Sequence, residues 1–272
     1  MPSQLACFVS GGAGGVALLL VGQPFDTLKV RMQTNPALYP TISTTIRHTL
    51  SKEGPRAFYK GTGAMLPVIT PLMACQFTGY EQGKRIFGDQ TLSQLALAGL
   101  FASCYTTPIY GPSERIKCIA QTTTRYGTNS VEIAKNVLKE GGARTLLRGF
   151  GMTFARESIG CASYYSTYAL IKMNCEKNGK FGVKENIFAG GMAGVMMWIL
   201  ACPADVMKSR IQIEPMSKPT GQILSEIKTD VRKNGIGVLY RGIGPTLMRA
   251  FPANAACFLG YEQAMKVVEK YV

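Results

Sequence analysis

One short motif occurs three times in this 272-residue chain, at intervals of about 90 residues, and it constrains the fold more than any other feature. Each copy begins with a proline, has an acid two residues later and has a lysine three residues after the acid. The copies begin at Pro24, Pro112 and Pro203. Even spacing of this kind indicates three copies of one structural unit. The repeats cover approximately residues 1–88, 89–178 and 179–272, and we interpret them as a single domain.

The sequence around each motif repeats as well. An apolar stretch with two small residues at helical spacing, such as Gly11 and Gly15, precedes each proline. This spacing lets neighbouring membrane helices approach closely. A polar segment follows each motif and ends in a basic residue and a glycine: Lys60-Gly61, Arg148-Gly149 and Arg241-Gly242. Each unit therefore predicts a helix that contains its proline, a short connecting helix and a second apolar helix.

Six apolar stretches have roughly the 20 residues that a helix needs to cross a bilayer. They start near residues 5, 65, 92, 152, 184 and 245. Short connecting helices are expected near residues 41–52, 129–139 and 221–233. The predicted fold class is an all-α membrane protein with six transmembrane helices in three pseudo-symmetric hairpins.

The charge balance agrees with a membrane protein. Charged residues make up only 17% of the chain, yet the net charge is +14. The basic residues recur at matching points of the repeats instead of gathering on one soluble face, which favours an anionic membrane surface over a nucleic acid as the partner. The eight cysteines form no CxxC pair and His48 is the only histidine, so we expect neither a metal site nor a cofactor.

The triple proline-acid-lysine motif, with a basic-glycine pair after each copy, resembles the mitochondrial carrier family over nearly the whole chain. The resemblance implies tilted helices around a central cavity, a multi-pass protein of the mitochondrial inner membrane, and alternating access between two gates. It also implies a matrix gate in which each acid pairs with the lysine of the next repeat. The implied pairs are Asp26–Lys117, Glu114–Lys208 and Asp205–Lys29, and Gln33, Gln121 and Gln212 would brace them.

A second ring of charges is implied at the cytoplasmic end. The family's aromatic-acid-x-x-base pattern is complete at Tyr80-Glu81 with Lys84. The second and third repeats each lack one charge, but they keep Lys172 and Glu262. We therefore expect a weakened gate with two bridges, Glu81–Lys172 and Glu262–Lys84.

Charges that do not repeat are candidates for substrate recognition, because ionisable residues inside apolar spans are functional candidates by default. Aligning the even-numbered spans places Val68-Ile69, Arg156-Glu157 and Arg249 at one level. Adjacent residues on a helix do not face each other. We therefore expect Arg156 and Glu157 to have separate partners, with the substrate among them. A structural ion pair between the two is the alternative.

Two arginines and one glutamate suit a solute with a carboxylate and a cationic group. Trp198 offers a ring face to a quaternary ammonium, with ordinary packing as the alternative. Within the family, the residues around Pro112 and from Arg249 to Glu262 are similar to carriers of carnitine esters, whereas Glu157 favours carriers of basic amino acids. The expected function is exchange of carnitine and acylcarnitines. The alternatives are basic amino acid transport (ornithine, lysine or arginine) and a non-transporting receptor or scaffold.

We do not expect an enzyme, because the sequence has no G-x-S-x-G, no Walker loop and no histidine within a span. A lipid partner is expected at the helix starts after Gly61, Gly149 and Gly242, where free N–H groups attract phosphate. The resemblance implies cardiolipin there, and simple glycine turns are the alternative. A closed ring of three repeats needs no second subunit, so we expect a monomer.

Overall fold

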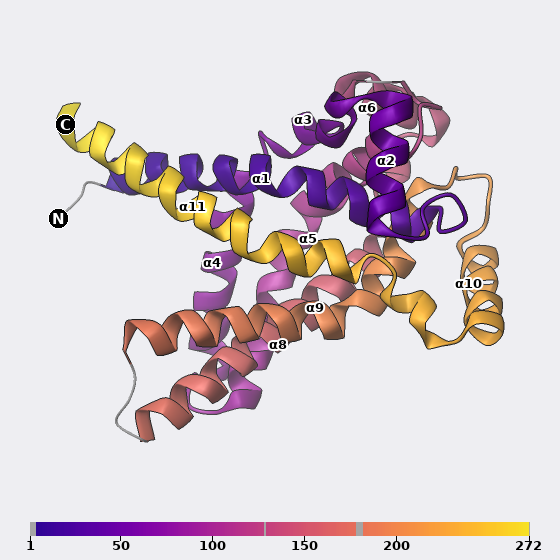
Figure 1. Cartoon of the computed structure of the whole chain (residues 1–272). Coiled ribbons are helices and arrows are strands. Elements are labelled where there is room, and N and C mark those ends of the chain that lie inside the picture. The colour runs from indigo at the N-terminus through magenta and orange to yellow at the C-terminus, as the bar shows by residue number, and fades with distance from the viewer. Residues whose placement is uncertain (1–3, 128, 178–181, 272) are drawn as a thin grey trace. The chain divides into compact units, whose positions relative to one another are not determined.

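The computed structural model describes residues 4–127, 129–177 and 182–271, and all regular structure in these ranges is helical (Figure 1). The long helices are α1 (Gln4–Thr34), α4 (Ile69–Phe87), α5 (Leu92–Thr122), α8 (Phe150–Lys177), α9 (Val183–Ile213) and α11 (Ile243–Tyr271). The short α-helices are α2 (Ile42–Glu53), α3 (Thr62–Met65), α6 (Ser130–Gly141), α7 (Ala143–Leu146) and α10 (Thr220–Asn234). Two 3-10 helices are η1 (Pro55–Tyr59) and η2 (Ile236–Tyr240). The predicted order of long helices and all three connecting helices are confirmed.

The chain forms two compact units. The first contains the described residues of Met1–Pro71, Ser113–Leu146 and Gly244–Val272, and the second contains Leu72–Pro112 and Leu147–Ile243. In the first unit α11 runs beside α1 (Figure 1). A Cβ atom on Gly260 would come within 2.8 Å of the Cβ of Ala17, so α11 needs a glycine there to pack against α1. In the second unit α8 and α9 pack along each other.

The proline-containing helices continue through their prolines, at Pro24 in α1, Pro112 in α5 and Pro203 in α9. The second span was expected to start near residue 65, but α4 begins at Ile69 and the short helix α3 precedes it. Pro67, which has no N–H to donate, lies in the break between Met65 and Ile69.

The ends of the connecting helices follow local sequence. Thr41 caps α2, and its side chain accepts a hydrogen bond from the backbone N–H of Thr44 at 3.2 Å. Gly54 then ends α2 with φ +77°, and Gly61 precedes α3 with φ +83°. Only glycine adopts such values readily. The glycines at the equivalent points of the other repeats also have positive φ: Gly142, Gly149, Gly235 and Gly242.

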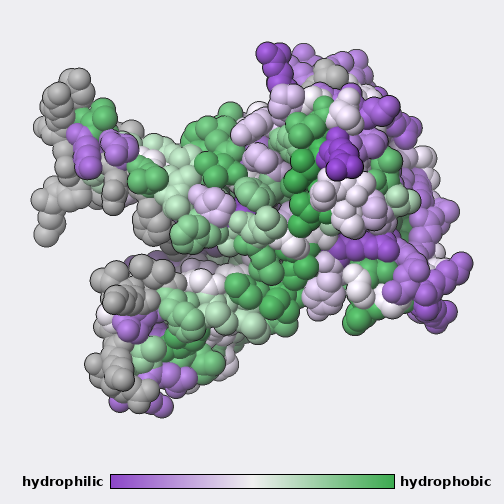
Figure 2. All heavy atoms as spheres, in the orientation of Figure 1, coloured by the Kyte–Doolittle hydropathy of each residue, from purple (hydrophilic) through white to green (hydrophobic). Residues whose placement is uncertain are grey.

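The long helices carry apolar residues on their exposed faces. Figure 2 shows hydrophobic residues along α1 and α11 of the first unit and hydrophilic residues around α2. Phe251 on α11 is 85% exposed, which fits contact with lipid. On length and composition alone, one stretch among the described residues is long and apolar enough to cross a membrane, Phe188–Ile213 in α9. The other spans are therefore recognised by their place in the repeat, since polar residues interrupt their apolar sequence.

The close helix contacts predicted from small residues are present in α5. A Cβ atom on Gly99 would lie 3.0 Å from the carbonyl of Cys161 on α8, and one turn later the hydroxyls of Ser103 and Ser158 are 2.8 Å apart. The matching Gly11 on α1 has no atom within 4 Å of its Cβ position. Close approach therefore differs among the three repeats.

Another pair of small residues, which was not predicted from the sequence, lies on α4. A Cβ atom on Gly79 would come within 2.9 Å of the Cα of Ala102, and one on Gly83 within 2.7 Å of the Cα of Ala98. These two glycines are four residues apart and face alanines with the same spacing on α5. They were overlooked because the search followed the proline-containing helices, although the spacing is visible in the sequence.

Candidate functional site

An ion pair of the predicted matrix gate lies in the first unit. The Lys117 Nζ on α5 is 2.6 Å from the Asp26 Oδ2 on α1. The Arg249 Nε on α11 is 3.4 Å from the other oxygen of the same carboxylate. The expected contact between the acid of one repeat and the lysine of the next is thus present, and a candidate substrate arginine joins it. The other two predicted pairs, Glu114–Lys208 and Asp205–Lys29, each join residues of different units and stay predictions.

The glutamines predicted to brace the gate are buried, but two of them bond threonines. The Gln121 amide donates to the Thr27 hydroxyl at 3.1 Å, and the Gln212 amide donates to the Thr153 hydroxyl at 3.1 Å. Each amide reaches a hydroxyl on a neighbouring helix instead of a gate carboxylate. Gln33, the third glutamine, is also buried.

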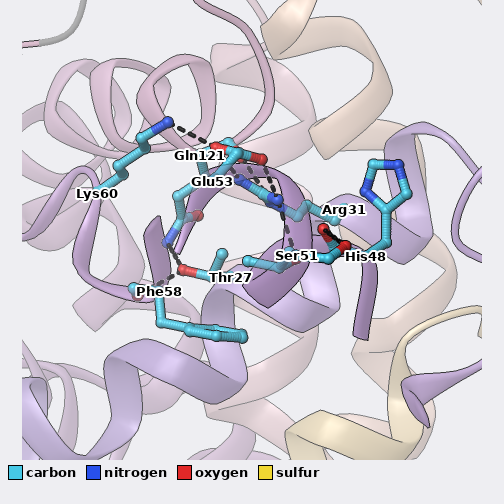
Figure 3. Close-up of polar contacts among 9 residues, drawn as sticks. Thr27, Arg31, His48, Ser51, Glu53, Phe58, Lys60 and Gln121 are labelled. Atoms are coloured by element: carbon cyan, nitrogen blue, oxygen red, sulfur yellow. Dashed lines mark hydrogen bonds and ion pairs between the residues drawn. The ribbon is translucent and has the colours of Figure 1, made fainter. Parts of the chain in front are cut away.

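A second ionic network in the first unit, absent from the sequence-based predictions, joins α1, α2 and the residue after η1 (Figure 3). The Arg31 guanidinium contacts both carboxylate oxygens of Glu53, at 2.5 and 3.0 Å, and its Nε donates to the backbone carbonyl of Gln121 at 3.0 Å. The Lys60 Nζ lies 2.6 Å from Glu53. Burial raises the pKa of Glu53, but the hydrogen bonds from Arg31 and Lys60 outweigh it and lower the pKa to about 2. Glu53 therefore ties the connecting helix to α1 as a carboxylate.

The third repeat builds the same network with its carboxylate one helical turn earlier. Arg210 Nη2 lies 3.0 Å from Asp230 Oδ2, and Arg241 Nη1 lies 3.5 Å from it. Asn234 occupies the position before the terminal glycine, where the first repeat has Glu53, and its amide donates to Asp230 at 2.7 Å. Relative to the first repeat, the acid of the third repeat therefore stands four residues earlier in the connecting helix, whereas both cations stand at equivalent positions.

The second repeat replaces this network with apolar contact. Ile119 stands at the position of Arg31, two residues after the gate lysine. It is fully buried in a cluster with Ala120, Tyr126, Ile133 and Val137. The network is therefore ionic in two repeats and hydrophobic in one.

The basic residues of the predicted lipid sites are engaged by the protein itself. Lys60 and Arg241 contact Glu53 and Asp230, as described above. Arg148 is 7% exposed, and its guanidinium donates to the backbone carbonyls of Ile211 at 3.0 Å and Lys218 at 2.6 Å. A lipid phosphate at these helix starts would therefore be bound mainly by backbone N–H groups.

The glycines beside these cations allow close packing. A Cβ atom on Gly61 would lie 2.9 Å from the carbonyl oxygen of Lys117, and one on Gly149 would lie 3.1 Å from the Gln212 side chain. Each glycine thus meets a gate residue of the following repeat. This packing and the positive φ values explain why glycine stands here, whatever binds the helix starts.

The second unit contains a cluster of four charges. The Arg156 Nη2 lies 2.5 Å from the Glu157 Oε1, and its Nε lies 3.9 Å from the Asp205 Oδ1. The Lys208 Nζ is 3.2 Å from the same Asp205 oxygen. All four are buried or nearly so: Asp205 and Lys208 are each 1% exposed, Arg156 is 7% exposed and the Glu157 side chain is 14% exposed. The two cations and two anions neutralise each other's charge, which burial away from water requires.

Two aromatic rings complete this cluster. The Arg156 guanidinium lies 5.2 Å from the ring centroid of Tyr110 and 5.8 Å from that of Trp198. Trp198 was predicted to offer its ring to a quaternary ammonium of the solute, and the cation beside it in the structure is the Arg156 guanidinium. Tyr110 was missed, because a tyrosine in an apolar span carries no charge to mark it.

Arg156 and Glu157 form an ion pair, which is the alternative that the sequence left open. Their Cβ atoms point in different directions on α8, but an arginine is long enough to turn back to its neighbour. Arg156 also contacts Asp205 on α9, so it does have a partner on another helix.

The apolar candidates lie in the first unit. Ile69 is 5% exposed, and a Cβ atom on Gly15 would lie 3.3 Å from its side chain. Ile69 thus packs against α1. Val68 is half-buried.

The cytoplasmic-gate residues make contacts within their own helices. The Lys84 Nζ lies 2.7 Å from Glu81 on α4, and the Lys172 Nζ lies 3.8 Å from Glu176 on α8. The expected bridge between Glu81 and Lys172 stays a prediction. The Glu262 side chain lies outside the described residues. Tyr80 stacks on Tyr165 with ring centroids 3.6 Å apart, so aromatic packing joins α4 to α8 here.

Comparison with known proteins assigns the family. A family model described as mitochondrial carrier protein matches residues 2–91, 89–179 and 180–272. The mitochondrial carnitine/acylcarnitine carrier protein of Rattus norvegicus is 37% identical over 98% of this chain and 95% of its own length. The mitochondrial carnitine carrier of Saccharomyces cerevisiae is 32% identical over 98% of this chain and 89% of its own. Mitochondrial magnesium exporter 1 of Drosophila melanogaster is 35% identical over 94% of this chain and 92% of its own. The chain therefore belongs to the mitochondrial carrier family, whose members are multi-pass transporters of the mitochondrial inner membrane.

Proposed function

We propose that this transporter exchanges small solutes that carry both a carboxylate and a cationic group, with carnitine and acylcarnitines as its substrates. The observation that carries the proposal is the cluster around Arg156 in the second unit. Glu157 supplies a carboxylate for an ammonium group, and Arg156 supplies a guanidinium that binds carboxylates in a bidentate manner. Trp198 supplies a ring face that attracts a quaternary ammonium.

The names of the relatives support this choice. Carriers named for carnitine or acylcarnitine match nearly the full length of the chain in a mammal and in yeast. A relative named for magnesium export has similar identity, so identity alone does not decide the solute. The chemistry of the cluster favours an organic zwitterion, because a guanidinium beside the acids repels a metal cation.

Basic amino acids are the second candidate. Glu157 and Asp205 both lie beside Arg156, so the cluster offers two carboxylates to a solute with two amino groups. Ornithine and lysine have two amino groups and one carboxylate, whereas carnitine has a single quaternary ammonium. The number of cationic groups on the preferred solute separates the two candidates.

We also propose gate and lipid roles for the repeated residues. Asp26–Lys117 acts as one bridge of the matrix gate, and the cytoplasmic gate closes when Glu81 leaves Lys84 for Lys172. Arg249, Val68 and Ile69 stay candidate substrate contacts on the strength of the repeat alignment. Cardiolipin phosphates bind the helix starts after the three repeated glycines.

Reconstitution tests the substrate proposal. The purified protein is inserted into liposomes that are loaded with unlabelled solute or left empty, and uptake of labelled carnitine, ornithine, lysine and Mg²⁺ is measured. We expect carnitine uptake that internal carnitine or acylcarnitine accelerates. Accelerated uptake of ornithine or lysine alone would support the second candidate, and accelerated Mg²⁺ uptake alone would overturn both. No uptake of any solute by folded protein would support a non-transporting receptor or scaffold.

A further inference from the structure

Tyr110 breaks the symmetry of the repeats beside the charge cluster. It lies on α5, two residues before Pro112. The equivalent positions before Pro24 and Pro203 hold Gly22 and Ala201. A large aromatic side chain thus stands in one repeat where the others have small residues. Residues that serve the common transport cycle should repeat, so a single exception at this level suggests a role with the solute.

The contacts of Tyr110 point to Arg156. The guanidinium carbon of Arg156 lies 5.2 Å from the Tyr110 ring centroid, within the distance of a favourable cation–π interaction. The Lys208 Nζ lies 5.9 Å from the same ring. Trp198 faces Arg156 at 5.8 Å. The guanidinium is therefore held by two rings as well as by Glu157 and Asp205.

The first unit provides an internal comparison. Arg249 occupies on α11 the repeat position that Arg156 occupies on α8. A Cβ atom on Gly22 would lie 3.2 Å from both the Cδ and the Nη1 of Arg249, so the absence of a side chain there leaves room for the arginine. Arg249 reaches Asp26 at 3.4 Å with no ring at that position. The residue two places before a proline thus lies beside an arginine in each unit, with a ring in one and a glycine in the other.

We propose that Tyr110 is a specificity-determining positioning residue, whose ring holds the Arg156 guanidinium where the carboxylate of a transported solute meets it. The solute part of this inference rests on the proposed function. Tyr110 acts through Arg156 and needs no contact with the solute. Without the ring, the guanidinium keeps Glu157 and Asp205 but loses a contact that fixes its orientation, and it then meets an incoming carboxylate less favourably.

This role predicts which solutes are affected. A solute with a carboxylate needs a correctly seated Arg156, whereas a solute with only a quaternary ammonium does not. Loss of the Tyr110 ring should therefore weaken the binding of carnitine. The binding of choline, which lacks the carboxylate and is measured as a competitor, should stay unchanged. A purely structural role for Tyr110 would weaken both equally.

The first experiment compares Tyr110→Phe, which keeps the ring, with Tyr110→Leu, which removes it. Carnitine exchange in liposomes is expected to show a KM roughly 5- to 10-fold higher in Tyr110→Leu, with Vmax within about twofold of the original protein. Tyr110→Phe should keep the original KM. Tyr105→Leu, on the same helix outside the cluster, is the matched control. Unchanged KM in Tyr110→Leu, or an equal loss for carnitine and choline, would overturn the proposal.

The second experiment needs no substrate and so remains decisive if the proposed function fails. Trp198 is the only tryptophan of the chain and lies beside Arg156, so its fluorescence reports the position of the Arg156 guanidinium. In detergent, Arg156→Gln is expected to shift the emission, Tyr110→Leu to shift it in the same direction, and Tyr110→Phe to leave it in place. Tyr110→Met provides a second ringless variant in case the leucine variant does not fold. Emission that stays unchanged in a folded ringless variant would contradict the proposal.

Discussion

Gly22 gives a direct test, at the scale of single residues, of how an arginine is seated. An alanine Cβ there would lie 3.2 Å from two atoms of the Arg249 side chain, so this side chain, which lies 3.4 Å from Asp26, must shift by a few tenths of an ångström. We expect Gly22→Ala to raise the KM for the exchanged solute about threefold and Gly22→Leu to raise it further, measured by exchange in liposomes.

Gly11→Ala is the matched control for this test, because nothing lies within 4 Å of its Cβ position on the same helix. Both substitutions raise helix propensity equally, by about 1 kcal/mol, so a difference between them reports the contact with Arg249. Equal KM values in the two alanine variants would show that Gly22 does not seat Arg249.

Single residues were predicted from the sequence to unequal degrees. The contact between Asp26 and Lys117 follows from repeat logic, because equivalent charges on successive helices come together at one level. The contact between Arg156 and Glu157 does not follow from helix geometry, because the arginine rotamer decides it. Tyr110 could have been found by comparing the repeats position by position, since it stands opposite glycine and alanine.

At the scale of elements, Glu53 is the residue that fastens α2 to α1. Glu53→Gln removes the charge that Arg31 and Lys60 contact and leaves the 3% exposed Arg31 without its carboxylate. We expect a loss of about 1–2 kcal/mol of unfolding free energy near neutral pH, since Glu53 is partly exposed. The apparent unfolding temperature of the purified protein measures it. Glu176→Gln, at an exposed pair of 3.8 Å, should change little.

The same residue sets a pH dependence. The folded-state pKa of Glu53 is lowered from 4.5 to about 2, so the unfolded chain binds its proton first as the pH falls. The stability that Glu53 contributes is therefore complete above its unfolded pKa and is lost as the pH falls toward 2. The difference in unfolding temperature between the original protein and Glu53→Gln should shrink across this window. A difference that stays constant from pH 6 to pH 3 would refute the assignment.

In the third repeat, the acid of the network can be moved by substitution to the position that it has in the first repeat. Asp230 stands one turn before the site of Asn234, where the first repeat has Thr49 and Glu53. Asp230→Thr should lower the unfolding temperature, because Arg210 loses its carboxylate. Adding Asn234→Glu should restore much of the loss by recreating the arrangement of the first repeat. Failure of the second substitution to recover any stability would show that the two networks are not equivalent.

The element order could be read from the repeat almost completely. The proline motifs and basic-glycine pairs predict the hairpins, and polar segments of the right length predict α2, α6 and α10. The break at Pro67 was missed because Pro24, Pro112 and Pro203 lie within continuous helices, so a proline alone does not say whether a helix stops. The close contacts of Gly79 and Gly83 were missed because they lie outside the repeated motif.

At the scale of the whole molecule, we assign the transport cycle to the repeated residues and solute recognition to the unrepeated ones. We propose that the repeated charges serve a common transport cycle, and the family assignment rests on a family model that matches all three repeats. The unrepeated residues Arg156, Glu157, Trp198 and Tyr110 gather in one cluster of the second unit. Sequence comparison identifies the transporter through the first group, whereas the solute depends on how the second group is arranged in space.

The most direct test of this account is carnitine exchange by Glu157→Gln. The substitution keeps the shape of the side chain and removes the only charge assigned to the cationic group of the solute. The account predicts that the KM for carnitine in preloaded liposomes rises roughly 30-fold or more, while Glu176→Gln exchanges normally. Carnitine exchange by Glu157→Gln with the original KM would contradict the claim that this cluster recognises the solute.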